Sequence, residues 1–539
     1  MKKLFFLLGI VIVSCNTNKE QVDLIVVNAN AYTIDVNFSK AEAFAIKDGK
    51  FVAVGTSEQI KSSYLSDITI DAEGKTITPG LIDAHCHFYN LGLQEQKVDL
   101  SGTISFEEVL ERIVSFQKEK NVGYITGRGW DQNDWEVKEF PTKEKLDKLF
   151  PDTPVAVTRI DGHALLANQA AIDLAEVTVN TTFSGGEILQ KEGKLTGVFI
   201  DVPMELILSK VPKPTKTESI QALKDAEKIS FSYGLTTVDD AGLSRETIEL
   251  IDSLQQVGEL QIRLYAMLSN YPENVDYFLK KGIIKTDKLN VRSVKVYGDG
   301  ALGSRGATLR ESYSDKKNHF GAMVTPVDAI EKLAIKIADS DYQMNTHAIG
   351  DSANIVVLKA YKKALKGNVN RRWRVEHAQV IPQAGFDYFK EGVIPSVQPT
   401  HATSDMYWAG DRLGEKRMKG AYAYKELLNM AGMIALGTDY PVEQVSPFLT
   451  FYAAVSRMDM DNYPEGGFQM HSALSREETL KGMTIWAAYA NFEENEKGSI
   501  EVGKFADFIV LDKNIMEIDV QEIPSIKVEQ VFLGGARAN

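Results

Sequence analysis

Two histidines one residue apart are the first side chains in this sequence whose types and spacing indicate chemistry. His85 and His87 end the apolar run Gly80-Leu-Ile-Asp-Ala-His-Cys-His87, which begins at the turn pair Pro79-Gly80. On a β-strand, residues i and i+2 point to the same side, so the two imidazoles can bind one metal ion together. The remaining ligands would then come from the ends of later strands.

Later apolar runs end in side chains of the same kinds. Imidazole and carboxylate ligands suit Zn²⁺ or another borderline divalent ion. The whole chain contains only 8 histidines, so their repeated position at the ends of apolar runs is hard to produce by chance. The residues that we expect to complete the metal centre begun by His85 and His87 are His347, His377 and Asp439, and Lys295 lies on another of these strands.

Eight apolar segments are the strands that we expect to position these residues. Most of the gaps after the second segment contain helical patterns. Eight alternating units predict an α/β fold of the (β/α)₈ TIM barrel class, whose active site lies at the C-terminal ends of its strands. The expected strands are Thr76–His87, Leu235–Ala241, Ile262–Leu268, Val291–Gly298, Gln343–Gly350, Trp373–Ala378, Ile394–Pro399 and Ile434–Asp439.

The gap between the first two strands is too long for a single crossover helix. We therefore expect residues 88–215 to form an inserted subdomain within a barrel domain that spans residues 78–497. Both chain ends contain short apolar runs separated by turns, which predict a small composite β-sandwich of residues 21–77 and 498–539. Within the insertion we expect a helix near Ser105–Lys118, a loop at Gly127–Asp131, a strand at Val155–Arg159 and a hairpin at Gly186–Val198.

Residues 1–20 indicate a lipoprotein signal peptide and tether. Lys2-Lys3, the apolar run Leu4–Val13 and the small residue Ser14 follow one another in the order of a secretory signal. The tetrapeptide ending in Cys15, Ile-Val-Ser-Cys, resembles a bacterial lipoprotein box, which implies cleavage before Cys15 and lipidation of its sulfur. The alternative is an ordinary signal peptide with an incidental cysteine. The lipoprotein interpretation predicts an exported protein, lipid-anchored to a bacterial membrane on its periplasmic or cell-surface side.

The composition is that of a soluble globular enzyme and argues against nucleic-acid binding. Hydrophobic residues make up 44% of the chain and charged residues 25%. The formal net charge is −14, and phosphate binding needs clustered Lys and Arg, of which no run occurs. The 2 cysteines, Cys15 and Cys86, cannot supply a disulfide framework.

The order of the strand-end residues resembles that of the amidohydrolase superfamily of metal-dependent hydrolases. His-x-His on the first strand, followed by Lys, His, His and Asp on later strands, is its pattern. Several longer sequence segments are similar to those of the amidohydrolase-3 branch, which includes N-substituted formamide deformylase. The resemblance covers nearly all of the chain after the tether. These segments are Thr346–Asp351, Val375–Gln379, Gln398–Asp405, Gly437–Val442 and Gly127–Gln132.

Lys295 is expected to point into the barrel, because Val294 and Val296 should face the helices. An unpaired buried ammonium is costly, so the lysine must lose its charge or find a partner. In the superfamily that the chain resembles, such a lysine takes up CO₂ and becomes a carbamate that bridges two metal ions. The alternative is a lysine paired with Asp299 or Asp439, near a single metal ion.

The resemblance implies that Asp439 is both a metal ligand and the proton carrier of a hydrolysis. Divalent ions lower the pKa of a nearby water towards neutrality and so supply hydroxide, while polarising the carbonyl that it attacks. Asp439 would take the proton from that water and deliver it to the leaving nitrogen. The expected cofactor is one or two divalent ions, with Zn²⁺ favoured. The alternative for Asp439 is a turn aspartate before Pro441.

Four further residues are candidates for substrate binding, each with a structural alternative. By resemblance, His401 and His163 line the pocket and hold the carbonyl oxygen, and the alternative is a core histidine. Trp130 packs on an apolar substituent or is an ordinary core tryptophan. Arg305 meets an anionic group or forms a structural ion pair.

The expected function is hydrolysis of a non-peptide C–N bond in an N-substituted amide or formamide. Alternatives within enzymes are an N-acyl amino acid deacylase, with Arg305 or Arg457 as the carboxylate clamp, and a cyclic amidine deaminase, which would not need Lys295. A lipoprotein that only binds a ligand is a further alternative, although it does not explain a complete ligand set with Asp439. The expected partners are a small-molecule amide, the membrane through the lipid, and a second copy of the chain in a homodimer.

Overall fold

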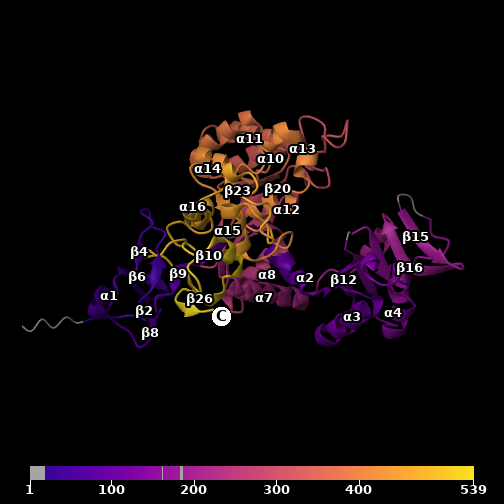
Figure 1. Ribbon diagram of the computed structural model, residues 1–539, viewed down its shortest axis with the longest axis horizontal. Helices are drawn as coiled ribbons and strands as arrows, with labels where there is room; N and C mark the ends of the chain where they lie inside the picture. Colours follow the sequence, from indigo (N-terminus) through magenta and orange to yellow (C-terminus); the bar gives the residue numbers. More distant parts are fainter. Residues whose placement is uncertain (1–18, 161, 183–185, 539) are drawn as a thin grey trace, which may run out of the picture. The chain divides into compact units, whose positions relative to one another are not determined.

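The computed structural model describes residues 19–160, 162–182 and 186–538. The predicted signal peptide, including Cys15 as the expected site of lipidation, lies outside these residues. The chain divides into two compact units, one made of Met1–His87 with Glu227–Asn539 and the other of Phe88–Ala226 (Figure 1). Within the described residues, no helix combines the length and the apolar composition needed to cross a bilayer.

The larger unit is built around eight parallel strands that pair in chain order, which confirms the predicted barrel class. Each barrel strand is buried along most of its length, and strands covered on both faces read as continuous apolar runs in the sequence. The strands are β10 (Leu81–Cys86), β17 (Leu235–Leu243), β18 (Arg263–Ser269), β20 (Leu289–Tyr297), β21 (Gln343–Ala348), β22 (Arg374–His377), β23 (Ile394–Val397) and β24 (Ala435–Leu436).

Helices follow most of these strands and cover the barrel. In α8, for example, the Ser244 hydroxyl accepts a hydrogen bond from the Thr247 amide as an N-cap, and an apolar face that includes Ile248 and Ile251 is buried. The α-helices of this unit that follow β17, with the 3₁₀ segment η3 (Gln383–Glu391), are α8 (Arg245–Gln256), α9 (Pro272–Lys281), α10 (Val327–Ala338), α11 (Asp351–Leu365), α12 (Pro399–Asp405), α13 (Ala409–Met418), α14 (Tyr424–Ala431), α15 (Pro447–Ser456), α16 (Arg476–Gly482) and α17 (Ile485–Ala490).

The barrel closes where the last strand meets the first. The amide of Asp439 donates to the carbonyl of His85, and the amide of His87 donates to the carbonyl of Tyr440, both at 2.8 Å. Gly437 allows this approach, since a Cβ there would lie 2.5 Å from the amide nitrogen of His85. The two ends of the chain segment that forms the barrel are thereby joined at its rim.

A buried carboxylate reinforces this closure. Asp83 on β10 accepts hydrogen bonds from the amide of Thr438 at 3.0 Å and from its hydroxyl at 2.7 Å. Burial raises the pKa of Asp83 to about 7, against the opposing effect of the bonds from Thr438. Asp83 therefore ties the loop after β24 to the strand that carries the two histidines.

The predicted strand Thr76–His87 is in fact two strands in two different sheets. β9 (Thr76–Pro79) belongs to the terminal domain, and β10 belongs to the barrel. The chain changes sheets at Gly80, where the backbone runs so close to Thr236 that a Cβ would lie 2.2 Å from its hydroxyl oxygen. A single apolar run in the sequence thus crosses the boundary between the terminal domain and the barrel.

Segments from both chain ends form two sheets that share one apolar core. Phe44 and Phe508 meet edge to face across the sheets with ring centroids 5.0 Å apart. A buried ion pair from Arg263 to Asp507, at 2.6 and 2.9 Å, attaches this domain to barrel strand β18. One sheet has the order β6 (Lys50–Gly55), β5 (Ala43–Lys47), β2 (Leu24–Val27), β8 (Thr69–Asp71), and the other β27 (Ala536–Arg537), β26 (Val528–Leu533), β25 (Phe508–Leu511), β9, β3 (Asn30–Tyr32), β4 (Lys40–Ala41).

The smaller unit has a six-stranded mixed sheet with its own apolar core. The predicted loop at Gly127–Asp131 is wrong, because Ile125–Trp130 is the strand β12 of this sheet. Gly127 marks a close approach of the neighbouring strand rather than a turn, since a Cβ would lie 2.7 Å from the carbonyl of Val98. The sheet has the order β11 (Val98–Asp99), β12, β13 (Val155–Arg159), β14 (Ala164–Ala167), β16 (Lys194–Asp201), β15 (Gly186–Lys191), with helices α2 (Phe88–Gln94), α3 (Phe106–Lys120), α4 (Glu144–Leu149), α5 (Gln169–Leu174) and α6 (Met204–Leu208).

Candidate metal centre

The two histidines of β10 are held so that the same ring nitrogen of each faces Asp439. Nδ1 of His85 donates to Oε2 of Glu376 at 2.5 Å, and Nδ1 of His87 donates to the carbonyl of Ala241 at 3.0 Å. Their Nε2 atoms lie 3.7 and 3.3 Å from Oδ1 of Asp439. An imidazole whose second nitrogen is fixed by an acceptor is the usual arrangement of a metal ligand.

Asp439 lies at the meeting point of the centre. Its Oδ1 is buried and has no hydrogen-bond partner among the described residues, while Oδ2 lies 3.2 Å from Nε2 of His401. Burial opposes ionisation of Asp439, but the nearby imidazoles of His401 and His87 outweigh it and hold the pKa of this carboxyl well below its usual range. The backbone is left-handed here, with φ 64°, a strain that costs about 1–3 kcal/mol and that clusters at functional sites.

His377 and His347 complete the ring of imidazoles. Nδ1 of His377 donates to the amide oxygen of Gln398 at 2.7 Å, and the rings of His377 and His347 have centroids 4.5 Å apart. Nε2 of His347 is buried without a hydrogen-bond partner in the described part of the chain. Like Asp439, His377 has a left-handed backbone, with φ 71°.

Burial keeps these imidazoles in the neutral form that binds metal ions. It lowers the pKa of His85 to about 4 and the pKa of His347 to about 3, and it holds the pKa of His377 well below its usual value. Neutral imidazole is the ligand form of histidine, so no proton has to be displaced from these residues at neutral pH.

Lys295 points into the barrel, as its place between Val294 and Val296 predicts. Its Nζ lies 2.9 Å from Nε2 of His85, and burial lowers its pKa to about 8. Asp299 is not its partner: that carboxylate accepts three backbone amides, those of Thr308, Ile349 and Gly350, at 2.7, 3.0 and 2.9 Å. The lysine therefore lies among the imidazoles with a partly neutral amine.

The donor set fits a divalent ion, and its geometry offers two positions. His85, His87 and Asp439 place ligand atoms within 4.8 Å of one another, and His377, His401 and Asp439 do the same. The two groups share Asp439, whose Oδ1 is one of the unpartnered buried atoms.

His401, which the sequence predicts as a substrate-binding residue, lies in the second group, but both of its ring nitrogens face carboxylates, Nε2 at 3.2 Å from Asp439 and Nδ1 at 3.0 Å from Glu443. Although burial opposes its protonation, these two carboxylates raise the pKa of His401 to about 10, which favours a hydrogen-bond donor to Asp439 over a metal ligand.

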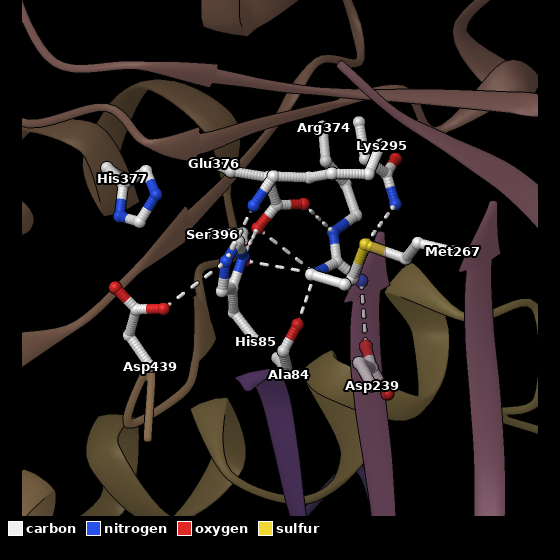
Figure 2. Close-up of polar contacts among 12 residues, drawn as sticks. Ala84, His85, Asp239, Met267, Lys295, Arg374, Glu376, His377, Ser396 and Asp439 are labelled. Carbon is white, nitrogen blue, oxygen red and sulfur yellow. Dashed lines mark hydrogen bonds and ion pairs between the residues drawn. The ribbon is translucent and has the colours of Figure 1, made fainter. Parts of the chain in front are cut away.

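The sequence did not predict the buried ionic network that supports His85. Arg374 donates to Oε1 of Glu376 at 2.7 Å and to Oδ2 of Asp239 at 2.8 Å, and Glu376 in turn accepts from His85 (Figure 2). Although burial opposes its ionisation, Arg374 outweighs burial and lowers the pKa of Glu376. The sequence pattern that could have indicated this network is the alternation along β22, which puts Arg374 and Glu376 on the same side of the strand.

Two of the weaker candidates, Trp130 and Arg305, lie in positions that their structural alternatives describe, and Arg457, the other possible carboxylate clamp, also bonds within the fold. Trp130 is fully buried in the core of the smaller unit, and its Nε1 donates to the carbonyl of Val157 at 2.9 Å. Arg305 forms an ion pair with Asp315 at 2.7 Å. Arg457 is fully buried in the larger unit and donates to the carbonyl of Phe468 at 2.9 Å.

His163 differs from these three because it is exposed. It belongs to the smaller unit, 74% of its side chain is accessible, and Nδ1 lies 2.7 Å from Oδ1 of Asp201. The alternative of a core histidine is therefore wrong. A role of His163 in substrate binding stays a prediction.

Comparison with known proteins agrees with this geometry. The sequence profile of the amidohydrolase family matches residues 69–538. The protein LONG AFTER FAR-RED 3 of Arabidopsis thaliana is 32% identical over 95% of this chain and 91% of its own length. N-substituted formamide deformylase of Arthrobacter pascens is 24% identical over 95% of this chain and 97% of its own length. The crystal structure of an uncharacterized metal-dependent hydrolase from Pyrococcus furiosus superimposes with a TM-score of 0.78 at 27% identity, covering 92% of this chain and 100% of that one.

The contact between Glu376 and His85 generates a prediction about metal affinity. Replacing Glu376→Gln removes the charge that orients His85, and loss of such a supporting residue lowers metal affinity by about 10- to 100-fold. Competition with a chelator measures the affinity. Glu331→Gln, the same change at a surface residue that pairs with Lys363, is the control, and equal affinities in the two variants would contradict the role given to Glu376.

Proposed function

Since the chain belongs to the amidohydrolase family of metal-dependent hydrolases, we propose that it hydrolyses a non-peptide C–N bond in an N-substituted amide or formamide. The observation that carries this proposal is the carboxylate of Asp439, which faces the imidazoles of His85 and His87 with one oxygen free. Further support comes from the similarity to N-substituted formamide deformylase along nearly the whole of both chains.

The residues of the centre have separate roles in such a hydrolysis. A divalent ion, when bound by the imidazoles and Asp439, polarises the carbonyl and lowers the pKa of the attacking water. Asp439, which stays ionised at neutral pH, accepts a proton from that water through its free Oδ1 and delivers it to the leaving nitrogen as the C–N bond breaks. His401 holds the other oxygen, so Asp439 keeps its orientation during both transfers. The products are a carboxylic acid and an amine.

The alternative of an N-acyl amino acid deacylase has less support. It needs a free cation for the substrate carboxylate, and the two arginines that the sequence offers are engaged elsewhere. Arg305 is paired with Asp315, and Arg457 is buried with its Nε bonded to the carbonyl of Phe468. A deaminase of cyclic amidines would leave the buried Lys295 without a role.

Amine release from a substrate panel tests the proposed reaction. The protein would begin after Cys15 and receive Zn²⁺ and bicarbonate, and the panel would hold N-alkyl and N-aryl formamides, acetamides and N-acyl amino acids. We expect turnover of formamides or acetamides that falls by about 10²- to 10⁴-fold in Asp439→Asn, because that variant lacks the proton carrier. Asp315→Asn, an aspartate outside the centre, should retain activity. Metal bound to the wild type without any amine release would refute amide hydrolysis.

For Lys295 we propose the carbamate that the family resemblance implies. The neutral fraction of a buried amine with a pKa of about 8 can add to CO₂ with loss of one proton. The resulting anion would lie beside His85, where it could bind metal together with the imidazoles.

Isotope-labelled bicarbonate detects this modification directly. We expect a carbamate resonance in the wild type and in Lys288→Met, and its absence in Lys295→Met, which should also bind less metal. A wild-type protein without the resonance at full metal occupancy would leave Lys295 as an unmodified amine.

For the N-terminus we propose export and lipid anchoring through Cys15, which rests on the sequence of residues 1–20 alone. Expressed in a bacterium, the wild type should fractionate with membranes and incorporate labelled fatty acid. Cys15→Ser should lose both properties, since the thiol is the lipid acceptor. Labelling that persists in the variant would contradict the assignment.

A further inference from the structure

His401 lies between two carboxylates that belong to one loop. Its Nε2 lies 3.2 Å from Oδ2 of Asp439, and its Nδ1 lies 3.0 Å from Oε1 of Glu443. Both carboxylates come from the loop that follows β24. Ionised carboxylates accept hydrogen bonds and cannot donate them, so the ring donates at both nitrogens. The contact with Glu443 therefore determines how His401 presents its other nitrogen to Asp439.

A serine on the same helix as His401 fixes Glu443 in turn. His401 and Ser404 both belong to α12, and residues three apart in a helix lie on one face. The hydroxyl of Ser404 donates to Oε1 of Glu443 at 2.7 Å, the same oxygen that binds His401. One oxygen of Glu443 thus joins two side chains of α12 to the loop that carries Asp439.

This series of contacts ends on the oxygen of Asp439 that faces away from the two histidines of β10. Oδ1 lies 3.3 Å from Nε2 of His87 and has no hydrogen-bond partner among the described residues, whereas Oδ2 is held by His401. A carboxylate held at one oxygen cannot turn about its Cβ–Cγ bond without breaking that contact. The contact with His401 therefore fixes the direction in which Oδ1 points.

Glu443 itself lies outside the metal centre. Its side chain is 20% exposed, and it borders a cavity of about 240 Å³ between α12 and α15, whose described lining residues include none of the candidate metal ligands. Because Glu443 borders open space, a side chain of the same shape can replace it without disturbing a packed core. Its route to the centre is the ring of His401.

We propose that Glu443 is a positioning residue, which acts through His401 to orient the carboxylate of Asp439 for proton transfer at the metal centre. The proposal rests on the proposed function, because it takes Asp439 as the proton carrier. The arrangement follows a general rule of acid–base sites, in which the group that moves the proton is oriented by a second group, and that one by a third. His401, with both nitrogens bound to carboxylates, has none left for the substrate carbonyl.

Replacing Glu443→Gln tests this role by kinetics. The variant keeps the shape of the side chain but loses its charge, and loss of such a supporting residue lowers activity by about 10- to 100-fold. We expect this loss in kcat for the best amide of the panel, with KM changed by less than about threefold, because the substrate binds at the metal centre rather than at Glu443. Ser404→Ala removes only one hydrogen bond to Glu443 and should lower kcat by less, about two- to tenfold. Glu465→Gln, the same change at an exposed residue after α15, should keep the wild-type kcat.

A second set of variants tests whether Glu443 acts through His401. In a His401→Gln background, adding Glu443→Gln should change kcat by less than about twofold, because the ring that transmits the effect is already absent. A further loss in the double variant as large as that of Glu443→Gln alone would overturn the proposal. A Glu443→Gln variant altered in KM alone would overturn it as well.

Nuclear magnetic resonance of protein with isotope-labelled histidine tests the contact without turnover. In the Zn²⁺-loaded protein we expect a slowly exchanging imidazole N–H signal from Nε2 of His401, identified by its absence in His401→Gln. The signal should remain in Glu465→Gln and be lost to rapid exchange in Glu443→Gln, because the hydrogen bond at one ring nitrogen sets the state of the other. A signal unchanged in Glu443→Gln would overturn the proposal.

The two kinds of measurement separate this proposal from the proposed function. A signal that depends on Glu443, in a protein that hydrolyses no amide, would refute the proposed reaction and retain the hold of Glu443 on His401. Amide hydrolysis with the same kcat in Glu443→Gln and the wild type would retain the reaction and refute the role of Glu443.

Discussion

Backbone hydrogen bonds from Asp439 to His85 and from His87 to Tyr440 join the last barrel strand to the first at the rim where the metal centre lies. The metal centre depends on this closure, because His85 and His87 belong to one side of the junction and Asp439 to the other. A separation of the two strands would move Asp439 away from both imidazoles at once. Gly437 and the carboxylate of Asp83 both serve this junction, one by allowing the strands to approach and the other by binding Thr438.

A second constraint comes from the charges buried beneath the centre. Arg374, Glu376 and Asp239 are completely buried, and such ion pairs often contribute little net stability because their desolvation is costly. Their value here is positional: Glu376 fixes the ring of His85, and Arg374 fixes Glu376. The barrel interior thus holds a rigid polar support where an apolar core would leave the imidazole free to rotate.

The sequence predicted the barrel because its buried parallel strands appear as continuous apolar runs. It also predicted the strand-end residues that meet in the structure, since strand ends in a barrel converge at one rim. It did not reveal the sheet change at Gly80, where one apolar run continues through a domain boundary, or the strand at Gly127, where glycine permits close packing. The place of His401 in a ligand group depends on the direction of α12, which no local pattern specifies.

The composite sandwich has a consequence for the order in which the chain can fold. β9 leads directly into the first barrel strand, yet its antiparallel partner β25 follows the whole barrel, with Thr76 paired to Leu511. During synthesis, β9 stays without this partner until almost the entire polypeptide has emerged. Pairings between such distant segments form slowly, because a long loop must close first. The terminal domain is therefore completed only after almost the whole chain has been synthesised, and the barrel strands can pair before it.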